Sequence, residues 1–331
     1  MEIGTIAEEI IAGRRLRRGE DLSFLVTCDL EELCEAADAV RRALCGDRVE
    51  LCSIVNGRSG HCGEDCKFCA QSAHHGADCE VYDLMDRERL LAACMENAAG
   101  GVDRFAIVTS GRALSGDDFE HAAEAFAEMK ERCAIDLCAS FGLLTDEQFA
   151  RLREAGVTRY HENLETSRRF FPEICTTHTY EDKVAAIRRA RAAGMEVCSG
   201  GIMGMGETWE DRIDMALELQ ELGVGSIPIN ILMPIPGTPL ADRSPLEEKE
   251  IHRCMAVFRL INPEAQIRMA GGRSLMPADG RDAFACGVSA TITGNMLTTS
   301  GSTIRSDREM LKELGRSCKP AGADSGTDKT L

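Results

Sequence analysis

A charged helical run that ends at glycine and continues into a short apolar run recurs along this chain. The clearest cases lie at residues 99–102, 155–157, 193–195 and 222–224. Glycine just past a helix provides the left-handed cap that ends it, and the short apolar run after it is typical of a buried strand. The repeated order of strand, helix and strand predicts parallel βαβ units.

The apolar runs define the predicted strands of one sheet. These strands are 49–54, 104–109, 135–140, 158–161, 196–199, 226–232, 266–269 and 289–293. Parallel strands in this number, alternating with helices, predict an α/β fold that is a (β/α)₈ TIM-type barrel or an incomplete relative of one. A doubly wound open sheet is the alternative that the same alternation allows.

Several predicted helices begin at a capping residue. Thr145 opens a capping box, and Thr179 and Thr208 are predicted caps of later helices. Ser244 followed by Pro245 predicts another helix start, since proline is favoured at the first helical position. These starts place each helix directly before the next predicted strand.

The chain divides into three predicted parts. Residues 1–47 precede the first strand and form an N-terminal helical extension, which includes a helix over Leu30–Leu44. Residues 48–316 form the barrel, including its substrate-binding C-terminal part. Residues 317–331 are small and polar, and their composition predicts a disordered tail.

The chain is acidic, with a net charge of −17 from 55 acidic and 38 basic side chains. This charge argues against nucleic acid or an anionic membrane as a partner, because both favour a basic surface. No run approaches the roughly 18 apolar residues of a membrane span. The charged first residues do not form a signal segment, which predicts a cytoplasmic protein whose 16 cysteines are thiols or metal ligands.

Three of these cysteines, Cys62, Cys66 and Cys69, stand at CxxxCxxC spacing. Three thiolates on one tight loop suit a 4Fe–4S cluster with one open iron, since a closed cluster takes four. An open metal position is typical of a catalytic site. Zinc binding and three unrelated buried thiols are the alternatives. The loop follows the first predicted strand, so we expect it at the carboxyl rim of the barrel, where barrel enzymes carry their chemistry.

Polar side chains also occur at or inside the predicted strands, where a barrel interior is normally apolar. They are Cys138, Asn163, Glu165, Cys198, Asn230 and Arg268. A single cysteine in a strand is ordinarily a small apolar residue. Two cysteines at matching strand positions together with a buried arginine are different, because a buried guanidinium needs an anion or an acceptor. An anionic iron–sulfur cluster would provide one.

Five motifs resemble the radical S-adenosylmethionine enzymes, and the biotin synthase family in particular. They are CGEDCKFCAQS at 62–72, YHENLETS at 160–167, VCSGGIMGMGET at 197–208, SIPIN at 226–230 and GTPL at 237–240. The resemblance covers roughly residues 40–315. It implies an enzyme, a sulfurtransferase, that converts dethiobiotin to biotin with S-adenosylmethionine and sulfur from an auxiliary cluster.

The resemblance also implies roles for individual residues. Cys62, Cys66 and Cys69 would hold the 4Fe–4S cluster, whose open iron S-adenosylmethionine chelates. The residues expected at S-adenosylmethionine are Phe68, Ser110, Gly111, Asn163, Glu165, Ile202 and Met205. Asn163 and Asn230 are expected to contact dethiobiotin, since amide groups suit a ureido ring.

The auxiliary cluster is where this chain departs from the family pattern. Many biotin synthases bind a 2Fe–2S cluster with three cysteines and an arginine, and Cys138, Cys198 and Arg268 match three of these positions. The remaining position is Ala106. Our hypothesis is that Cys52, on the neighbouring first strand, replaces the missing ligand. Three thiolates suit a 2Fe–2S cluster with arginine or a larger four-iron cluster with a spare sulfide, and we favour the larger one.

The family further implies a flavodoxin- or ferredoxin-type reductant and a homodimer. Two other functions remain open at this stage. One is a radical S-adenosylmethionine maturase or mutase with the same barrel and another small substrate, which Ala106 favours. The other is an electron-transfer or metal-storage protein, although such proteins are usually small and use closed four-cysteine clusters.

Overall fold

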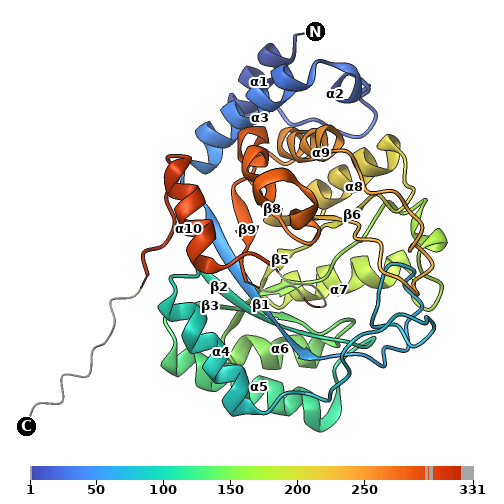
Figure 1. The fold of residues 1–331 in the computed structure, drawn as a ribbon, viewed down its shortest axis with the longest axis vertical. Helices are drawn as coiled ribbons and strands as arrows, with labels where there is room; N and C mark the ends of the chain where they lie inside the picture. The colour runs from blue at the N-terminus through green and yellow to red at the C-terminus, as the bar shows by residue number, and fades with distance from the viewer. Residues whose placement is uncertain (1, 295–296, 298–300, 322–331) are drawn as a thin grey trace, which may run out of the picture.

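The computed structural model describes residues 2–294, 297 and 301–321, and it contains a closed parallel barrel (Figure 1). The strands are β1 Glu50–Arg58, β2 Arg104–Thr109, β3 Asp136–Ser140, β4 Val157–His161, β5 Glu196–Cys198, β6 Gly201–Met203, β7 Ser226–Ile231, β8 Gln266–Met269 and β9 Ala290–Ile292. Neighbours pair in the order β5, β4, β3, β2, β1, β9, β8, β7 and β6. β5 also pairs with β7, through Cys198 and Ser226, which closes the ring.

This closure confirms the predicted barrel and shows that the open-sheet alternative is wrong. All eight predicted strands are present, with ends that differ by a few residues. The sequence did not indicate β6, a three-residue strand that extends β5 after Gly200 and pairs with β7. β5 and β6 therefore fill one position of the barrel.

Helices surround the barrel (Figure 1). They are α1 Ile3–Ile11, α2 Phe24–Thr27, α3 Leu30–Cys45, α4 Arg87–Ala99, α5 Gly116–Arg132, α6 Asp146–Glu154, α7 Tyr180–Ala192, α8 Trp209–Glu221, α9 Glu248–Ile261 and α10 Ile304–Glu313, with short 3₁₀ helices at Phe171–Glu173, Arg273–Leu275 and Pro277–Cys286. Thr145 forms the predicted capping box, and the predicted caps Thr179 and Thr208 also form capping boxes. The predicted start at Ser244 is wrong, because α9 begins at Glu248.

The N-terminal helices pack outside the barrel, next to α9, at one end of the molecule (Figure 1). α1 lies against α3, and α3 lies against α9. Ile6, Ile10, Ala37 and Val40 are fully buried in these contacts, and burial of an Ile side chain contributes about 1.5–3 kcal/mol to stability.

After α10 the chain returns to the barrel, where Ser317 pairs with Arg48. The described chain thus continues past the predicted boundary at 316; residues 322–331 of the predicted tail lie outside the described residues.

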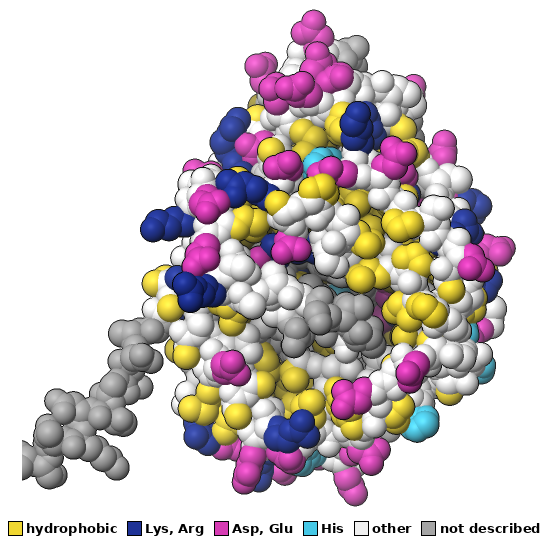
Figure 2. All heavy atoms as spheres, viewed as in Figure 1, with side chains coloured by type: hydrophobic (Ala, Val, Ile, Leu, Met, Phe, Trp, Pro, Cys, Tyr) yellow, Lys and Arg dark blue, Asp and Glu magenta, His cyan; other side chains and the backbone are white. Residues whose placement is uncertain are grey.

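Acidic side chains are spread over the surface and gather over the N-terminal helices (Figure 2). Within the described ranges, none of the helices has the length and apolar character that crossing a membrane requires.

Candidate active site

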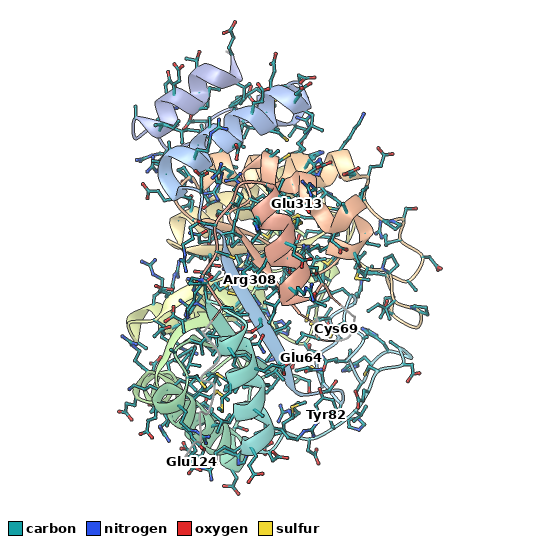
Figure 3. The ribbon with its side chains drawn as sticks, turned by 60° about the vertical axis from the view of Figure 1, so that its left-hand side comes forward. Glu64, Cys69, Tyr82, Glu124, Arg308 and Glu313 are labelled. Atoms are coloured by element: carbon teal, nitrogen blue, oxygen red, sulfur yellow. The ribbon has the colours of Figure 1, made fainter. Side chains whose placement is uncertain are left out.

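The cysteine loop lies between β1 and α4, beyond the carboxyl end of β1. Cys69 and Glu64 mark its position beside that strand in Figure 3. The loop curls back on itself: Cys62 N–H donates to Gln71 O at 3.0 Å, and Ala73 N–H donates to Cys62 O at 2.8 Å. The loop is therefore placed at the rim of the barrel, where its three thiols were predicted to lie.

The thiols of this loop are partly exposed, and their surroundings differ. Cys66 Sγ donates to Cys175 Sγ at 3.7 Å. This hydrogen bond and burial raise the pKa of Cys66, and burial raises the pKa of Cys69 to about 11. The contact of Cys175 with a predicted cluster ligand is a feature that sequence reasoning missed.

A cavity of about 360 Å³ runs from the cysteine loop into the barrel. The predicted site residues that line it are Phe68, Asn163, Glu165, Ile202, Asn230, Cys52, Cys138, Cys198 and Arg268. The structure thus brings four of the seven predicted S-adenosylmethionine residues together with the predicted substrate and auxiliary-cluster residues around one space. Ser110, Gly111 and Met205 are not part of this lining, and neither are Cys62, Cys66 and Cys69. Ser110 Oγ donates to Gly60 O at 2.8 Å, and Met205 packs in an apolar cluster with Phe68 and Ile202.

Asn163 and Glu165 follow β4 and are fixed by Gly200, just before β6, and by Gly201, at its start. Asn163 Oδ1 accepts from Gly200 N–H at 3.0 Å, and Glu165 pairs as an isolated bridge with Gly201. Glu165 adopts a left-handed backbone with φ of 69°, a conformation that costs energy for a residue with a side chain. Burial raises the pKa of its carboxyl group, so this buried side chain holds a proton more readily than an exposed glutamate.

Asn230 on β7 is oriented by two backbone groups. Its Oδ1 accepts from Gly271 N–H at 2.9 Å, and its Nδ2 donates to Gly201 O at 3.1 Å. An amide oxygen has a second lone pair and an amide nitrogen a second hydrogen. Asn230 can therefore present both a donor and an acceptor to a ligand in the cavity.

The three buried thiols lie deeper in the same cavity, on β1, β3 and β5. Ala106 stands opposite Ile54 on β1 and opposite Cys138 on β3. Cys52 is two residues before Ile54, so both side chains face the same side of β1, about 7 Å apart along the strand. The thiol of Cys52 thus faces the same side of β1 as Ile54. It lies nearer the amino end of the barrel than Ala106, the position where the family has a ligand cysteine.

The electrostatic surroundings of these thiols are unequal. Burial raises the pKa of Cys52 and of Cys138 to about 12. Burial also acts on Cys198, but the neighbouring His161 outweighs it and lowers the pKa of Cys198 to about 6. Sequence reasoning did not select His161, although it lines the cavity beside Asn163.

Arg268 belongs to an ion-pair network that closes the amino end of the barrel. Arg268 and Arg159 both bind Glu50, Arg159 at 2.6 Å. Glu196 joins Arg159 to Arg104 at 2.9 and 3.4 Å. The three guanidiniums line the cavity around the thiols. Arg104 Nε is buried without a hydrogen-bond partner among the described residues, so this end of the cavity is suited to an anion.

Comparisons with known proteins agree with this site. The radical SAM superfamily model matches residues 58–219, and the biotin and thiamin synthesis associated domain matches 228–317. The biotin synthase of Alkaliphilus metalliredigens is 58% identical over 95% of this chain and 99% of its own length, and that of Clostridium beijerinckii is 56% identical over 94% and 98%. A methylornithine synthase structure has a TM-score of 0.81 at 20% identity, covering 96% of this chain and 98% of its own, which supports the barrel fold alone.

These matches confirm the prediction of a radical SAM enzyme. They also confirm its predicted cofactors, a 4Fe–4S cluster with S-adenosylmethionine and an auxiliary iron–sulfur cluster. The identity to curated biotin synthases, over nearly the whole chain, favours this function over a maturase or mutase of the same barrel. The chain belongs to the biotin synthase family.

Proposed function

We propose that this chain inserts sulfur into dethiobiotin to form biotin. The observation that carries this proposal is one cavity that reaches from Phe68 on the cysteine loop to the thiols of Cys52, Cys138 and Cys198. Such a cavity gives a single substrate access to a radical site and to a sulfur source. The relatives named biotin synthase support the same reaction.

Cys62, Cys66 and Cys69 are the proposed ligands of the 4Fe–4S cluster. The donor set fits this group, because three thiolates from one loop leave one iron open for S-adenosylmethionine. The backbone hydrogen bonds at Cys62 hold the ends of the loop together. Phe68, between two of the ligands, lines the cavity and would exclude water on that side.

Asn163, Glu165 and Ile202 are the proposed contacts of S-adenosylmethionine in the cavity, and Ser110, Gly111 and Met205 support the surrounding walls. Carboxylate and amide oxygens suit ribose hydroxyl groups. Asn163 and Asn230 are the proposed contacts of dethiobiotin, since each presents a fixed amide to the same space.

Cys52, Cys138, Cys198 and Arg268 are the proposed site of the auxiliary cluster. The surroundings fit an anionic cluster, because three guanidiniums line this end of the cavity and Arg104 Nε lacks a partner among the described side chains. Three thiolates without a fourth protein thiolate favour a four-iron cluster that keeps one open iron over a 2Fe–2S cluster.

When bound, the two clusters and S-adenosylmethionine supply a 5′-deoxyadenosyl radical and the sulfur atom. The chain itself positions the substrate between these sites and keeps water away. The apolar side chains Ile54, Val108 and Ile292 line the cavity between the polar ends, so a radical formed there meets the bound substrate rather than solvent.

The activity is tested by anaerobic single-turnover assay with dethiobiotin, S-adenosylmethionine and a low-potential reductant. We expect biotin together with 5′-deoxyadenosine. Release of 5′-deoxyadenosine without biotin, from protein whose auxiliary cluster is intact, would contradict the proposed substrate and favour a maturase or mutase.

The ligand set is tested by iron and sulfide analysis with Mössbauer spectra of the anaerobically purified protein. In Cys52→Ser we expect the auxiliary cluster to be lost and the 4Fe–4S cluster to remain. Cys94→Ser is the matched control, because Cys94 is equally buried in α4 but lies outside the cavity. A 2Fe–2S signal that persists in Cys52→Ser would refute both the ligand and the larger cluster.

The family membership also supports a flavodoxin- or ferredoxin-type reductant, a homodimer and a cytoplasmic location. Exchange of the natural reductant for dithionite in the assay tests the first of these, and light scattering of the purified protein tests the second.

A further inference from the structure

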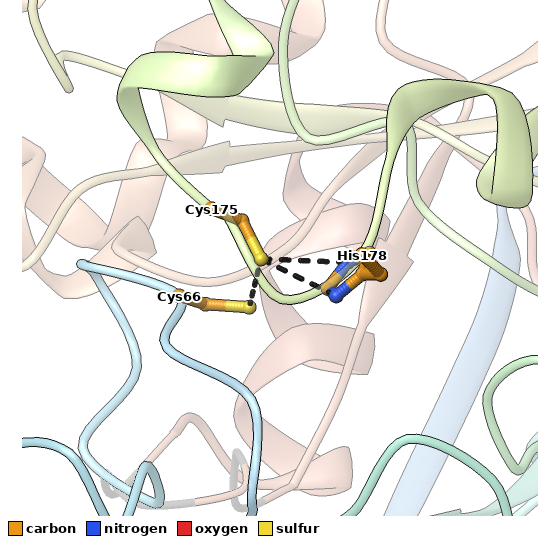
Figure 4. A group of neighbouring side chains, drawn as sticks. All are labelled: Cys66, Cys175 and His178. Carbon is orange, nitrogen blue, oxygen red and sulfur yellow. Dashed lines mark hydrogen bonds between the residues drawn. The ribbon is translucent and has the colours of Figure 1, made fainter.

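We propose that Cys66, Cys175 and His178 form a second metal site, which binds one thiophilic divalent cation when the 4Fe–4S cluster is absent. Their ligand atoms lie within 4.8 Å of one another. Figure 4 shows the thiol of Cys66 directed across the gap between two loops toward Cys175, with His178 beside it. The proposal goes beyond the proposed function, and its competition with the cluster rests on Cys66 being a cluster ligand.

The distances match a tetrahedral ion. Two thiolates bound at the usual Zn–S length of about 2.3 Å are about 3.8 Å apart in a tetrahedral site, and the observed distance between Cys66 Sγ and Cys175 Sγ is 3.7 Å. A thiolate and an imidazole nitrogen on the same ion are about 3.6 Å apart. Cys175 Sγ lies 3.8 Å from His178 Nε2 and 3.3 Å from His178 Nδ1. The two thiols are therefore spaced for an ion, whereas the imidazole must turn to direct Nε2 at it.

One ring nitrogen of the imidazole is held by a carboxylate, as in many metal-binding histidines. His178 Nδ1 lies 2.5 Å from Glu64 Oε2, and a carboxylate at one ring nitrogen leaves the other nitrogen free to bind metal. His178 and Glu64 are both nearly buried. Two thiolates and one imidazole form a donor set that selects zinc, cobalt or ferrous iron over calcium and magnesium, with water in the fourth position.

The loop that carries Cys175 is fixed to the cysteine loop by a second acidic residue. Asp65 Oδ1 accepts from the backbone N–H of Thr176 at 2.8 Å and of Thr177 at 3.2 Å. Thr177 Oγ1 donates to Glu64 Oε2 at 2.7 Å. These contacts hold the two loops together without any metal, so the two thiols are preorganised.

Because Cys66 belongs to both sites, the ion and the cluster exclude each other. Ferrous iron held here would lie beside the loop into which the cluster is built, whereas zinc would block that loop. Ferrous iron and zinc would use the same three ligands but differ in their effect on cluster assembly. The rate of cluster reconstitution after loading with each metal therefore distinguishes them.

The test uses cobalt as a probe of the full-length chain after anaerobic removal of the clusters. In the wild type we expect thiolate-to-cobalt charge-transfer bands. Cys66→Ser, Cys175→Ser and His178→Gln should each bind one cobalt ion per chain fewer than the wild type. Cys62→Ser and Cys69→Ser are matched controls on the same loop and should keep this ion. Any cobalt bound by the cavity thiols is common to all five variants and cancels in the comparison.

The reverse pattern is expected for the cluster: Cys175→Ser assembles the 4Fe–4S cluster in full, measured by iron content and by electron paramagnetic resonance after reduction, whereas Cys62→Ser does not. This measurement also shows that Cys175→Ser is folded. Preloaded zinc should slow reconstitution in the wild type and not in Cys175→Ser. The proposal is overturned if Cys175→Ser binds as much cobalt as the wild type, or if Cys62→Ser and Cys69→Ser lose the same ion.

Discussion

Glu50 holds together the closed end of the cavity. Its carboxylate binds both Arg159 and Arg268, and its side chain is only 17% exposed. Glu196, the other carboxylate on Arg159, is 60% exposed. A charge pair in water contributes little, whereas the loss of one member of a buried pair leaves its partner uncompensated. The two glutamates therefore differ in importance although they bind the same arginine.

Replacement of Glu50 by Gln should destabilise the protein strongly. We expect a loss of about 3–5 kcal/mol in the free energy of unfolding, the usual effect of an unpaired buried charge. Glu196→Gln is the control and should cost less than about 1 kcal/mol. Urea titration of both variants measures the difference. Equal losses would contradict the role assigned to Glu50.

The same carboxylate predicts a dependence of stability on pH. Burial alone raises the pKa of Glu50, but Arg268 and Arg159 outweigh it and hold the pKa well below its usual range. Because the pKa of Glu50 is lower in the folded than in the unfolded protein, its ionised form stabilises the fold at any pH above the unfolded pKa, about 4.3 for Glu. This stabilisation is lost progressively as the pH falls below that pKa. From pH 6 to pH 3 the wild type should lose more stability than Glu50→Gln; parallel curves would exclude this linkage.

The elements of the barrel could be predicted from the sequence where apolar runs are bounded by glycine and capping residues. β2 was predicted with its exact limits, because Arg104–Thr109 is an apolar run after two glycines. β6 was not, because Gly201–Met203 is short and directly follows another glycine. Glycine is needed at both positions because neighbouring backbone leaves no room for a side chain. This close approach of two chain segments exists only in the folded protein.

Gly201 is the test of that close contact. A Cβ atom there would lie 2.4 Å from Glu165 O and 2.6 Å from Met215 Sδ. Gly201→Ala should therefore cost about 1–3 kcal/mol through overpacking and weaken S-adenosylmethionine binding by displacing Glu165. Gly225→Ala is the control, since nothing lies within 4 Å of its Cβ position. Unfolding and calorimetric binding measure both effects, and unchanged affinity in Gly201→Ala would refute the positioning of Glu165.

At the scale of the whole molecule, closure of the barrel brings together residues that the sequence keeps far apart. Glu50 begins β1 and Arg268 lies within β8, and they meet because β1 and β8 both adjoin β9. The motif cysteines could be predicted because their spacing is local. The ion-pair network of Arg104, Arg159 and Glu50 could not be predicted from the sequence, because each residue alone looks like an ordinary charged residue of a strand.

The N-terminal extension, residues 1–47, should unfold in the same transition as the barrel. Ile10 on α1 is fully buried, whereas the adjacent Ile11 is 38% exposed. Arg18, after α1, also binds Glu218 and Glu221 on α8, at 3.1 and 2.9 Å. The extension is therefore joined to the barrel through apolar and charged contacts.

Ile10→Ala should cost about 2–5 kcal/mol, the usual range for a buried Ile, and Ile11→Ala should have little effect. Trp209, the sole tryptophan, lies on α8 of the barrel and not on the extension, so its fluorescence reports the unfolding of the barrel. We expect its urea transition to shift to lower concentration in Ile10→Ala, because one cooperative unit transmits the loss. If circular dichroism instead shows helix lost first while the Trp209 transition stays in place, the extension folds separately and the prediction is wrong.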